Sequence, residues 1–131
     1  MLILHTTEDV FKSVLETAAI SNLPAERIYT GIDNDTIKAP CVVLSATEGK
    51  EEIKNSGIYR VRLAVKVKEI AYDTSTEITL AVDVFNVLCN SDFNSITNYA
   101  VYDLSVEDQH NAESGDAWTQ TILLEVVCVL T

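Results

Sequence analysis

A histidine surrounded by carboxylates in the C-terminal third of the sequence is the first candidate for chemistry. His110 has acidic neighbours on both sides. They are Glu107, Asp108, Glu113 and Asp116. A histidine beside carboxylates can act as an acid–base pair or bind a divalent metal ion. Both functions need burial that tunes the side chains, and this polar segment is instead typical of a solvated hairpin loop. We therefore predict an exposed loop over residues 108–116.

Two further metal signals are incomplete. The segment 33–35, Asp-Asn-Asp, resembles the opening of a calcium loop, but Lys38 stands where that loop requires glycine. Zinc sites use closely spaced ligand pairs, whereas Cys41, Cys89 and Cys128 are isolated. We interpret all three cysteines as buried free thiols, which are typical of a reducing compartment. No motif of a hydrolase, nucleotide-binding protein or metalloprotease occurs, so we predict no enzyme, no metal and no cofactor.

Basic residues recur on one face of a predicted strand. They are Arg60, Arg62, Lys66 and Lys68. One interpretation is a solvated face whose cations pair with acids on adjacent strands, such as Glu48 or Glu125. A second is a surface that meets an acidic patch on another copy or another protein. A third, contact with nucleic acid, is disfavoured because the net charge is −11 and no aromatic residues are interleaved with the cations.

The composition describes one globular domain, residues 1–131. Hydrophobic residues make up 47% of the chain and charged residues 22%, which are ordinary values for a folded domain. The apolar runs are far shorter than the roughly 18 residues that span a bilayer. The N-terminus has no basic segment of the kind that begins a signal peptide. We expect no membrane segment and no targeting sequence.

Hydrophobic periodicity predicts two helices and up to five strands. Apolar residues spaced by three and four predict a helix that follows Thr6 as N-cap, with Glu8 on its polar face, and a second helix that begins at a capping box in 74–77. Alternation of apolar and polar residues predicts the strands. The strands cover 27–32, 41–45, 58–68, 99–107 and 118–130.

This order of elements predicts an α+β fold. Most neighbouring strands are joined by loops, which implies an antiparallel four- to five-stranded sheet, and the two amphipathic helices are expected to pack on one face of it. The last strand is apolar on both sides, since Leu123, Val127 and Val129 lie opposite its main apolar face. Such a strand is either a central strand covered twice or part of a subunit interface.

The same order resembles small tailed-bacteriophage proteins of the head–tail neck, the tail terminator and tail-completion proteins. The resemblance covers most of the chain. It rests on the N-terminal helix, LPAERIYTG at 23–31, APCVVL at 39–44, a polar hairpin arm at 47–57, the long strand 58–68, a helix containing VFNVL at 84–88, and a closing hairpin with GDAWTQ at 115–120.

The resemblance implies a structural virion protein rather than an enzyme. It implies a hexameric ring that caps the finished tail tube, stops its polymerisation and offers a surface to the head connector. Such a protein is made in the host bacterial cytoplasm and resides in the virion neck or tail. DNA would pass through the bore of so acidic a ring without specific binding.

The resemblance also implies two sets of contact residues. The long and last strands match the region of subunit contacts, and the arm matches the family's protruding loops. The subunit-interface candidates are Arg60, Arg62, Lys66, Lys68, Leu123, Glu125, Val127 and Val129. The candidate contacts on the arm are Glu48, Lys50, Glu51, Glu52 and Lys54.

Two other functions remain open. One is a different neck role, as a head-completion or connector-adaptor protein. The other is a soluble α+β module that binds a small ligand or a peptide, which predicts a monomer or dimer with an apolar pocket. An enzyme would need reactive side chains that converge on a cleft, and the sequence offers no such set.

Overall fold

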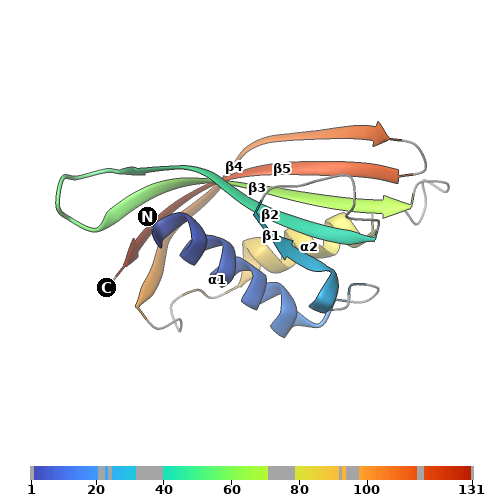
Figure 1. Ribbon diagram of the computed structural model, residues 1–131, viewed down its shortest axis with the longest axis horizontal. Coiled ribbons are helices and arrows are strands. Elements are labelled where there is room, and N and C mark those ends of the chain that lie inside the picture. Colours follow the sequence, from blue (N-terminus) through green and yellow to red (C-terminus); the bar gives the residue numbers. More distant parts are fainter. Residues whose placement is uncertain are drawn as a thin grey trace.

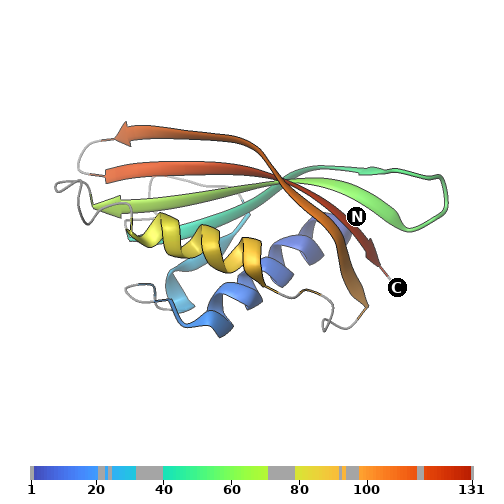
Figure 2. The same ribbon diagram turned by 180° about the vertical axis from the view of Figure 1, so that it is seen from behind.

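The computed structural model describes residues 2–20, 23, 25–31, 40–70, 79–91, 93, 98–114 and 117–130. They form an α+β fold with one five-stranded sheet in the order β1-β2-β3-β5-β4 (Figure 1). The elements are α1 (Leu2–Ala18), a 3-10 turn (Ala25–Arg27), β1 (Ile28–Thr30), β2 (Cys41–Glu51), β3 (Ile58–Ile70), α2 (Thr79–Asn90), β4 (Tyr99–Ser114) and β5 (Ala117–Leu130). Figures 1 and 2, seen from opposite sides, draw both helices below the sheet.

The sheet is mixed, and the prediction of a wholly antiparallel sheet is wrong at one pair of strands. Strand β1 pairs with β2 in parallel, with Ile28 opposite Val42. The other three pairs of strands are antiparallel, as predicted. A three-residue strand carries no directional signal in its pattern of apolar residues, because the pattern reads the same in both directions.

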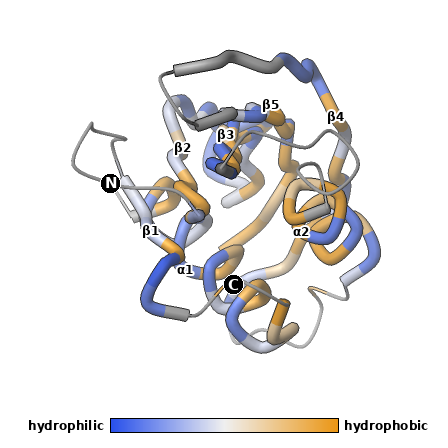
Figure 3. The backbone as a smooth tube through the Cα atoms, turned by 90° about the vertical axis from the view of Figure 1, so that its right-hand side faces the viewer, coloured by the Kyte–Doolittle hydropathy of each residue, from blue (hydrophilic) through white to orange (hydrophobic). Residues whose placement is uncertain are grey.

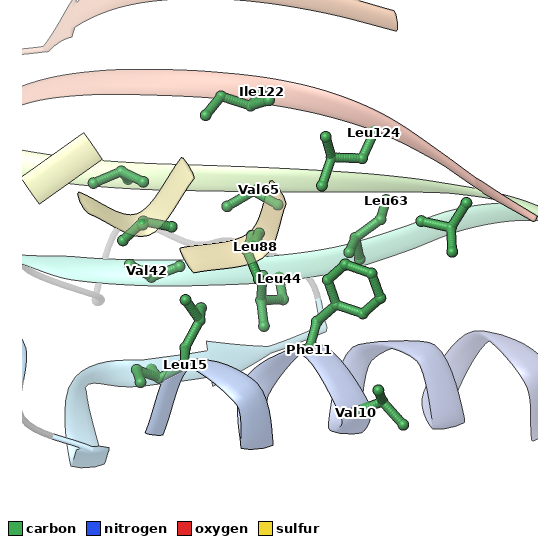
Figure 4. Close-up of a cluster of buried hydrophobic side chains, with 14 of the residues drawn as sticks. Val10, Phe11, Leu15, Val42, Leu44, Leu63, Val65, Leu88, Ile122 and Leu124 are labelled. Carbon is green, nitrogen blue, oxygen red and sulfur yellow. The ribbon is translucent and has the colours of Figure 1, made fainter. Parts of the chain in front are cut away.

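The core lies between the helices and the face of the sheet that we call the inner face. The inner face is defined by Val42, Leu44, Val61, Leu63, Val65, Val67, Ile122, Leu124 and Val126, all buried. Phe11 and Leu15 of α1 reach toward these strands (Figure 4). Viewed along the molecule, the helices and the curved sheet surround this centre, with orange hydrophobic stretches along the strands (Figure 3). Each large side chain buried here contributes about 1.5–3 kcal/mol.

Helix α1 begins earlier than predicted. It starts at Leu2, so Thr6 lies within the helix and not at its N-cap. The prediction that Glu8 lies on the polar face of this helix is also wrong, because Glu8 is buried. The ring of Phe11 stacks on that of Phe93 with 4.8 Å between centroids, which fixes the chain just after α2 against α1.

The first turn of helix α2 donates a hydrogen bond to a carboxylate of β3. The predicted capping box at 74–77 lies outside the described residues, as does the segment 33–35. Within the described chain, the backbone N–H of Leu80 donates to the buried carboxylate of Glu69 at 3.0 Å. A carboxylate at a helix N-terminus satisfies a free donor and interacts favourably with the helix dipole.

The predicted loop 108–116 is largely a strand. Strand β4 continues to Ser114, and its register with β5 pairs Asp108 with Leu123 and Ser114 with Ala117. Only 115–116 fall outside the described residues of this hairpin. Residues 108–110 are exposed on an edge strand, since β4 has a neighbour on one side only in the described sheet.

Candidate functional site

The outer face of the sheet, opposite the inner face, carries a network of ion pairs. Arg60 and Arg62 point outward from β3 because they alternate with the buried Val61 and Leu63. Each arginine contacts two carboxylates of the same chain. The four acids are Glu48, Glu52, Glu107 and Glu125. The interpretation of a charged face paired across strands is therefore confirmed for both arginines.

Arg60 links the arm to the centre of the sheet. Its Nε donates to Glu52 at the end of the arm, and its Nη1 donates to Glu125 of β5. The hydrogen bonds from Arg60 lower the pKa of the Glu52 carboxyl below its ordinary value of 4.5. The same two glutamates raise the pKa of Arg60. The arm is thus held to the sheet by charge-assisted hydrogen bonds that depend on ionised carboxylates.

Arg62 spans four strands of the sheet. Its Nη1 donates to Glu48 of β2 at 3.5 Å, and its Nη2 donates to Glu107 of β4, beyond the intervening β5. Glu107 is the extra residue in a register shift between Val106 and Asp108. A bulge of this kind re-aims a side chain, and here the side chain meets Arg62.

The remaining basic candidates are less exposed. Lys66 and Lys68 are half-buried on β3, and both have interaction partners within the chain. Lys66 lies between Val43 of β2 and Thr121 of β5 in the register, and both of these neighbours are buried. The structure therefore places these two lysines in the sheet and away from the arginine network at the base of the arm.

The apolar candidates belong to an interior strand. Strand β5 lies between β3 and β4, so it is the central strand that one of the two interpretations predicted. Val129 is buried, whereas Leu123, Glu125 and Val127 are half-buried. Val127 is paired with Arg60 and Asp103 in the register, so charged side chains flank it. Contacts of these residues with another subunit remain a prediction.

The arm projects beyond the core as an extension of β2 and β3 (Figure 1). Thr47, Glu48, Gly49 and Lys50 are exposed on β2, and 52–56 are exposed in the turn. The arm candidates divide by role. Glu48 and Glu52 bind the arginines, and Glu51 accepts hydrogen bonds from the turn backbone. Lys54 points to solvent at the tip.

Among the residues that the structure describes, His110 and its acidic neighbours do not form a catalytic or metal-binding centre. His110 and Asp108 approach to 3.8 Å on β4, and the side chain of His110 is 56% exposed. Glu107 is paired with Arg62 and is not available to the histidine. No group of three or more potential metal ligands occurs in the described part of the chain. Asp116 lies outside the described residues.

Buried polar residues form a cluster that the sequence analysis missed. The hydroxyls of Thr7 and Tyr99 lie 3.1 Å apart in the core, and the Thr7 hydroxyl lies 4.0 Å from the Cys128 sulfur. Burial raises the pKa of both Tyr99 and Cys128, so both stay protonated near neutral pH. These contacts join α1 to β4 and β5, so we assign them a role in stabilising the fold.

The cysteine prediction is wrong for one residue. Cys41 and Cys128 are buried free thiols, but Cys89 is exposed on α2. Cys89 lines an open groove of about 240 Å³ between the end of α2 and the start of β4. The groove is smaller than the roughly 300–1,000 Å³ of small-molecule sites. Within the described chain, neither helix has the length and apolarity needed to cross a membrane.

Comparison with known proteins leaves the family open. No family model matches the sequence, and no curated protein matches it.

Proposed function

We propose that this protein is a structural component of a tailed-bacteriophage neck. In this proposal it forms a hexameric ring that terminates the tail tube and joins it to the head connector, with no catalytic activity. The element order supports the proposal, because an N-terminal helix, a projecting polar hairpin, a long strand, a second helix and a closing hairpin follow one another as in that family. The protein would be made in the host cytoplasm and reside in the virion.

The arm is the observation that carries the proposal. It extends beyond the core (Figure 2), and its turn residues 52–56 are all exposed. It is nevertheless fixed to the sheet at two points, near its base by Arg62 through Glu48 and Glu107, and near its tip by Arg60 through Glu52 and Glu125. A projection that is rigid and exposed favours contact with another subunit, because a preorganised segment loses little entropy on binding.

The two faces of the sheet would then have different tasks. The helices packed on the inner face build the core, and the outer face with the arm meets neighbouring copies. Arg60 and Arg62 enter such a contact as part of an ion-pair network and not as free cations. A net charge of −11 for each copy repels a phosphate backbone, which suits a bore that conducts DNA without binding it.

A connector-adaptor or head-completion role is the main alternative, and the arm supports it equally. Deleting the gene from the phage separates the two. A terminator mutant is expected to give tails of uncontrolled length that remain unjoined to heads. An adaptor mutant is expected to give tails of normal length that fail to join, a result that would exclude the terminator role.

Electron microscopy of the purified protein tests the ring directly. We expect closed rings with an open bore for the natural protein. Arg62→Glu is expected to abolish them, because it places a third carboxylate between Glu48 and Glu107 and releases the base of the arm. Lys12→Glu makes the same change of charge on α1, at an exposed pair with Glu16, and should leave the rings intact. Rings that survive Arg62→Glu would count against a role of the outer face.

A further inference from the structure

The tip of the arm presents an isoleucine on a constrained turn. Ile53 is 63% exposed. The backbone N–H groups of Asn55 and Gly57 donate to the two carboxylate oxygens of Glu51, at 2.9 and 3.2 Å. Asn55 and Gly57 have φ of 62° and 76°, a left-handed conformation that closes the turn. The backbone of the turn that carries this exposed apolar side chain is therefore constrained before any partner binds.

The groove at the end of α2 is open, and both polar and apolar side chains line it. Phe93, Val101 and Leu104 line it with apolar surface, and Cys89 lies beside them. Tyr102 also lines it and is 64% exposed, at a bulge between Val101 and Asp103. Exposed tyrosines in hollows are frequent anchors of protein interfaces.

Charge distinguishes the tip from the groove. Lys54 follows Ile53, and Asp103 lines the groove. Among the residues that the structure describes, neither Lys54 nor Asp103 forms an ion pair. The acids near the tip are already engaged, since Glu52 binds Arg60 and Glu51 binds the turn backbone. The tip thus offers an apolar side chain beside a cation, and the groove offers the side chains of Tyr102 and Leu104 beside the anion of Asp103.

We infer that Ile53 and Lys54 of one copy dock into this groove of a second copy, with Ile53 against Tyr102 and Leu104 and Lys54 beside Asp103. The inference rests on the proposed self-assembly and names its two contact surfaces. The tip and the groove are different surfaces at different places on the chain, so the contact is heterologous. Repeated contacts of this type close into a ring or extend as a filament.

The free edge of β4 is a weaker surface for self-association. Two register shifts interrupt it, between Val101 and Asp103 and between Val106 and Asp108. Bulges and carboxylates on an edge strand oppose pairing with another strand. Docking of a side chain into the groove does not require a regular edge.

Thiol cross-linking tests the contact with a cysteine that the chain already has. Ile53→Cys places a thiol at the tip, and oxidation with diamide is expected to join it to Cys89 of the next copy. Non-reducing gels should then show a ladder of covalent oligomers, because each copy has both partners. Adding Cys89→Ser to Ile53→Cys should remove the ladder.

Val82→Cys provides a matched control. Val82 is 46% exposed on α2, so its thiol is also accessible. It lies seven residues before Cys89 on the helix, about 10 Å along the axis, and therefore outside the proposed contact, since a disulfide needs Cα atoms within about 7 Å. We expect no ladder from this variant.

A charge exchange tests the same contact without oxidation. Ile53→Asp should raise the concentration at which the protein assembles by about tenfold or more. Lys54→Asp and Asp103→Lys should each weaken assembly, and the two together should restore it. Because all three residues are exposed, circular dichroism of each variant should match that of the natural protein.

Each outcome separates this inference from the proposed function. Rings that persist in Ile53→Asp and give no ladder with Ile53→Cys would overturn the inference while the ring proposal stands. A ladder from filaments that never close would support the contact and overturn the ring. A natural protein that stays monomeric, together with the absence of a ladder from Ile53→Cys, would overturn both.

Discussion

The buried carboxylate of Glu8 in α1 accepts a hydrogen bond from the backbone N–H of Ala46 in β2 at 2.8 Å. Ala46 lies at a register shift in the pairing of β2 with β3, where the ladder is interrupted before Glu48. The helix therefore supplies an acceptor for a backbone donor of β2 at the last paired position before the shift. This contact fixes α1 to the base of the arm.

Removing this carboxylate is expected to destabilise the fold. Glu8→Ala leaves the Ala46 N–H without its acceptor in a part-buried site, at a cost of about 1–3 kcal/mol. Urea unfolding followed by circular dichroism measures the change. Glu16→Ala, at an exposed position of the same helix, is the control and should change stability little. Equal effects of the two substitutions would show that the Glu8 contact contributes nothing.

The Thr7 and Tyr99 hydroxyls should be energetically coupled. Tyr99→Phe and Thr7→Val each remove one partner of the 3.1 Å hydrogen bond, at a cost of about 1 kcal/mol or more. The double variant is expected to lose less than the sum of the two single losses. Strictly additive losses in urea unfolding would contradict the coupling.

The Glu52 carboxyl should titrate below its ordinary value. Arg60 lowers its pKa from 4.5, so its ionised form is favoured in the folded state. A lowered folded pKa gives a contribution to stability that is present above 4.5 and is lost as the pH falls through the folded value. The attachment of the arm should therefore loosen in acid and remain intact at neutral pH.

Carboxyl-detected NMR titration measures this shift. Arg60→Gln should return the pKa of Glu52 toward 4.5, because the hydrogen bond from the guanidinium is its largest cause. Added salt should reduce the shift, since the pair is exposed. An unchanged titration of Glu52 in Arg60→Gln would show that the two side chains do not pair in solution.

Thiol labelling should distinguish the three cysteines. Cys89 is exposed and should react first, whereas Cys41 and Cys128 should react only after unfolding. Partial burial raises the pKa of Cys89 above 9.0, so its rate should keep rising as the pH passes that value. Mass spectrometry of the labelled protein locates the modified residue. Labelling of Cys128 in the folded protein would contradict the burial described here.

The alternation of apolar and polar residues predicted the strands well where one face of the strand is buried. Val61, Leu63, Val65 and Val67 alternate with charged or small residues, and β3 contains all of them on the inner face. The same rule failed at the end of β4, because an edge strand with exposed faces need not carry apolar residues. Polarity alone made that segment resemble a loop.

The burial of Glu8 could have been predicted from its spacing along the helix. Leu4, Glu8, Phe11 and Leu15 recur at intervals of four, three and four, which place them on one side of a helix. The prediction placed Glu8 on the polar face because of its residue type, since glutamate is rarely buried without a partner. Glu8 contacts the Ala46 N–H at 2.8 Å and the His5 side chain at 3.6 Å. A backbone donor on a distant strand leaves no mark in the sequence.

The residues of the ion-pair network on the outer face could be predicted from the sequence, but which acid pairs with which arginine could be predicted only in part. Pairing of the basic face with Glu48 and Glu125 was one of the open interpretations, and Arg62 and Arg60 make those contacts. Glu107 was assigned to the surroundings of His110, because its contact with Arg62 depends on a bulge in β4. The groove at Tyr102 depends on how the chain at the end of α2 lies beside β4, which local patterns do not encode.

The mass of the purified protein in solution tests the central claim, self-assembly into a ring, most directly. Light scattering behind a sizing column, over a range of concentrations and at low and high salt, gives the number of 14.4 kDa copies in each species. We predict a closed species near six copies that forms at high concentration and weakens with salt. A mass of 14.4 kDa at every concentration and salt level would contradict the claim.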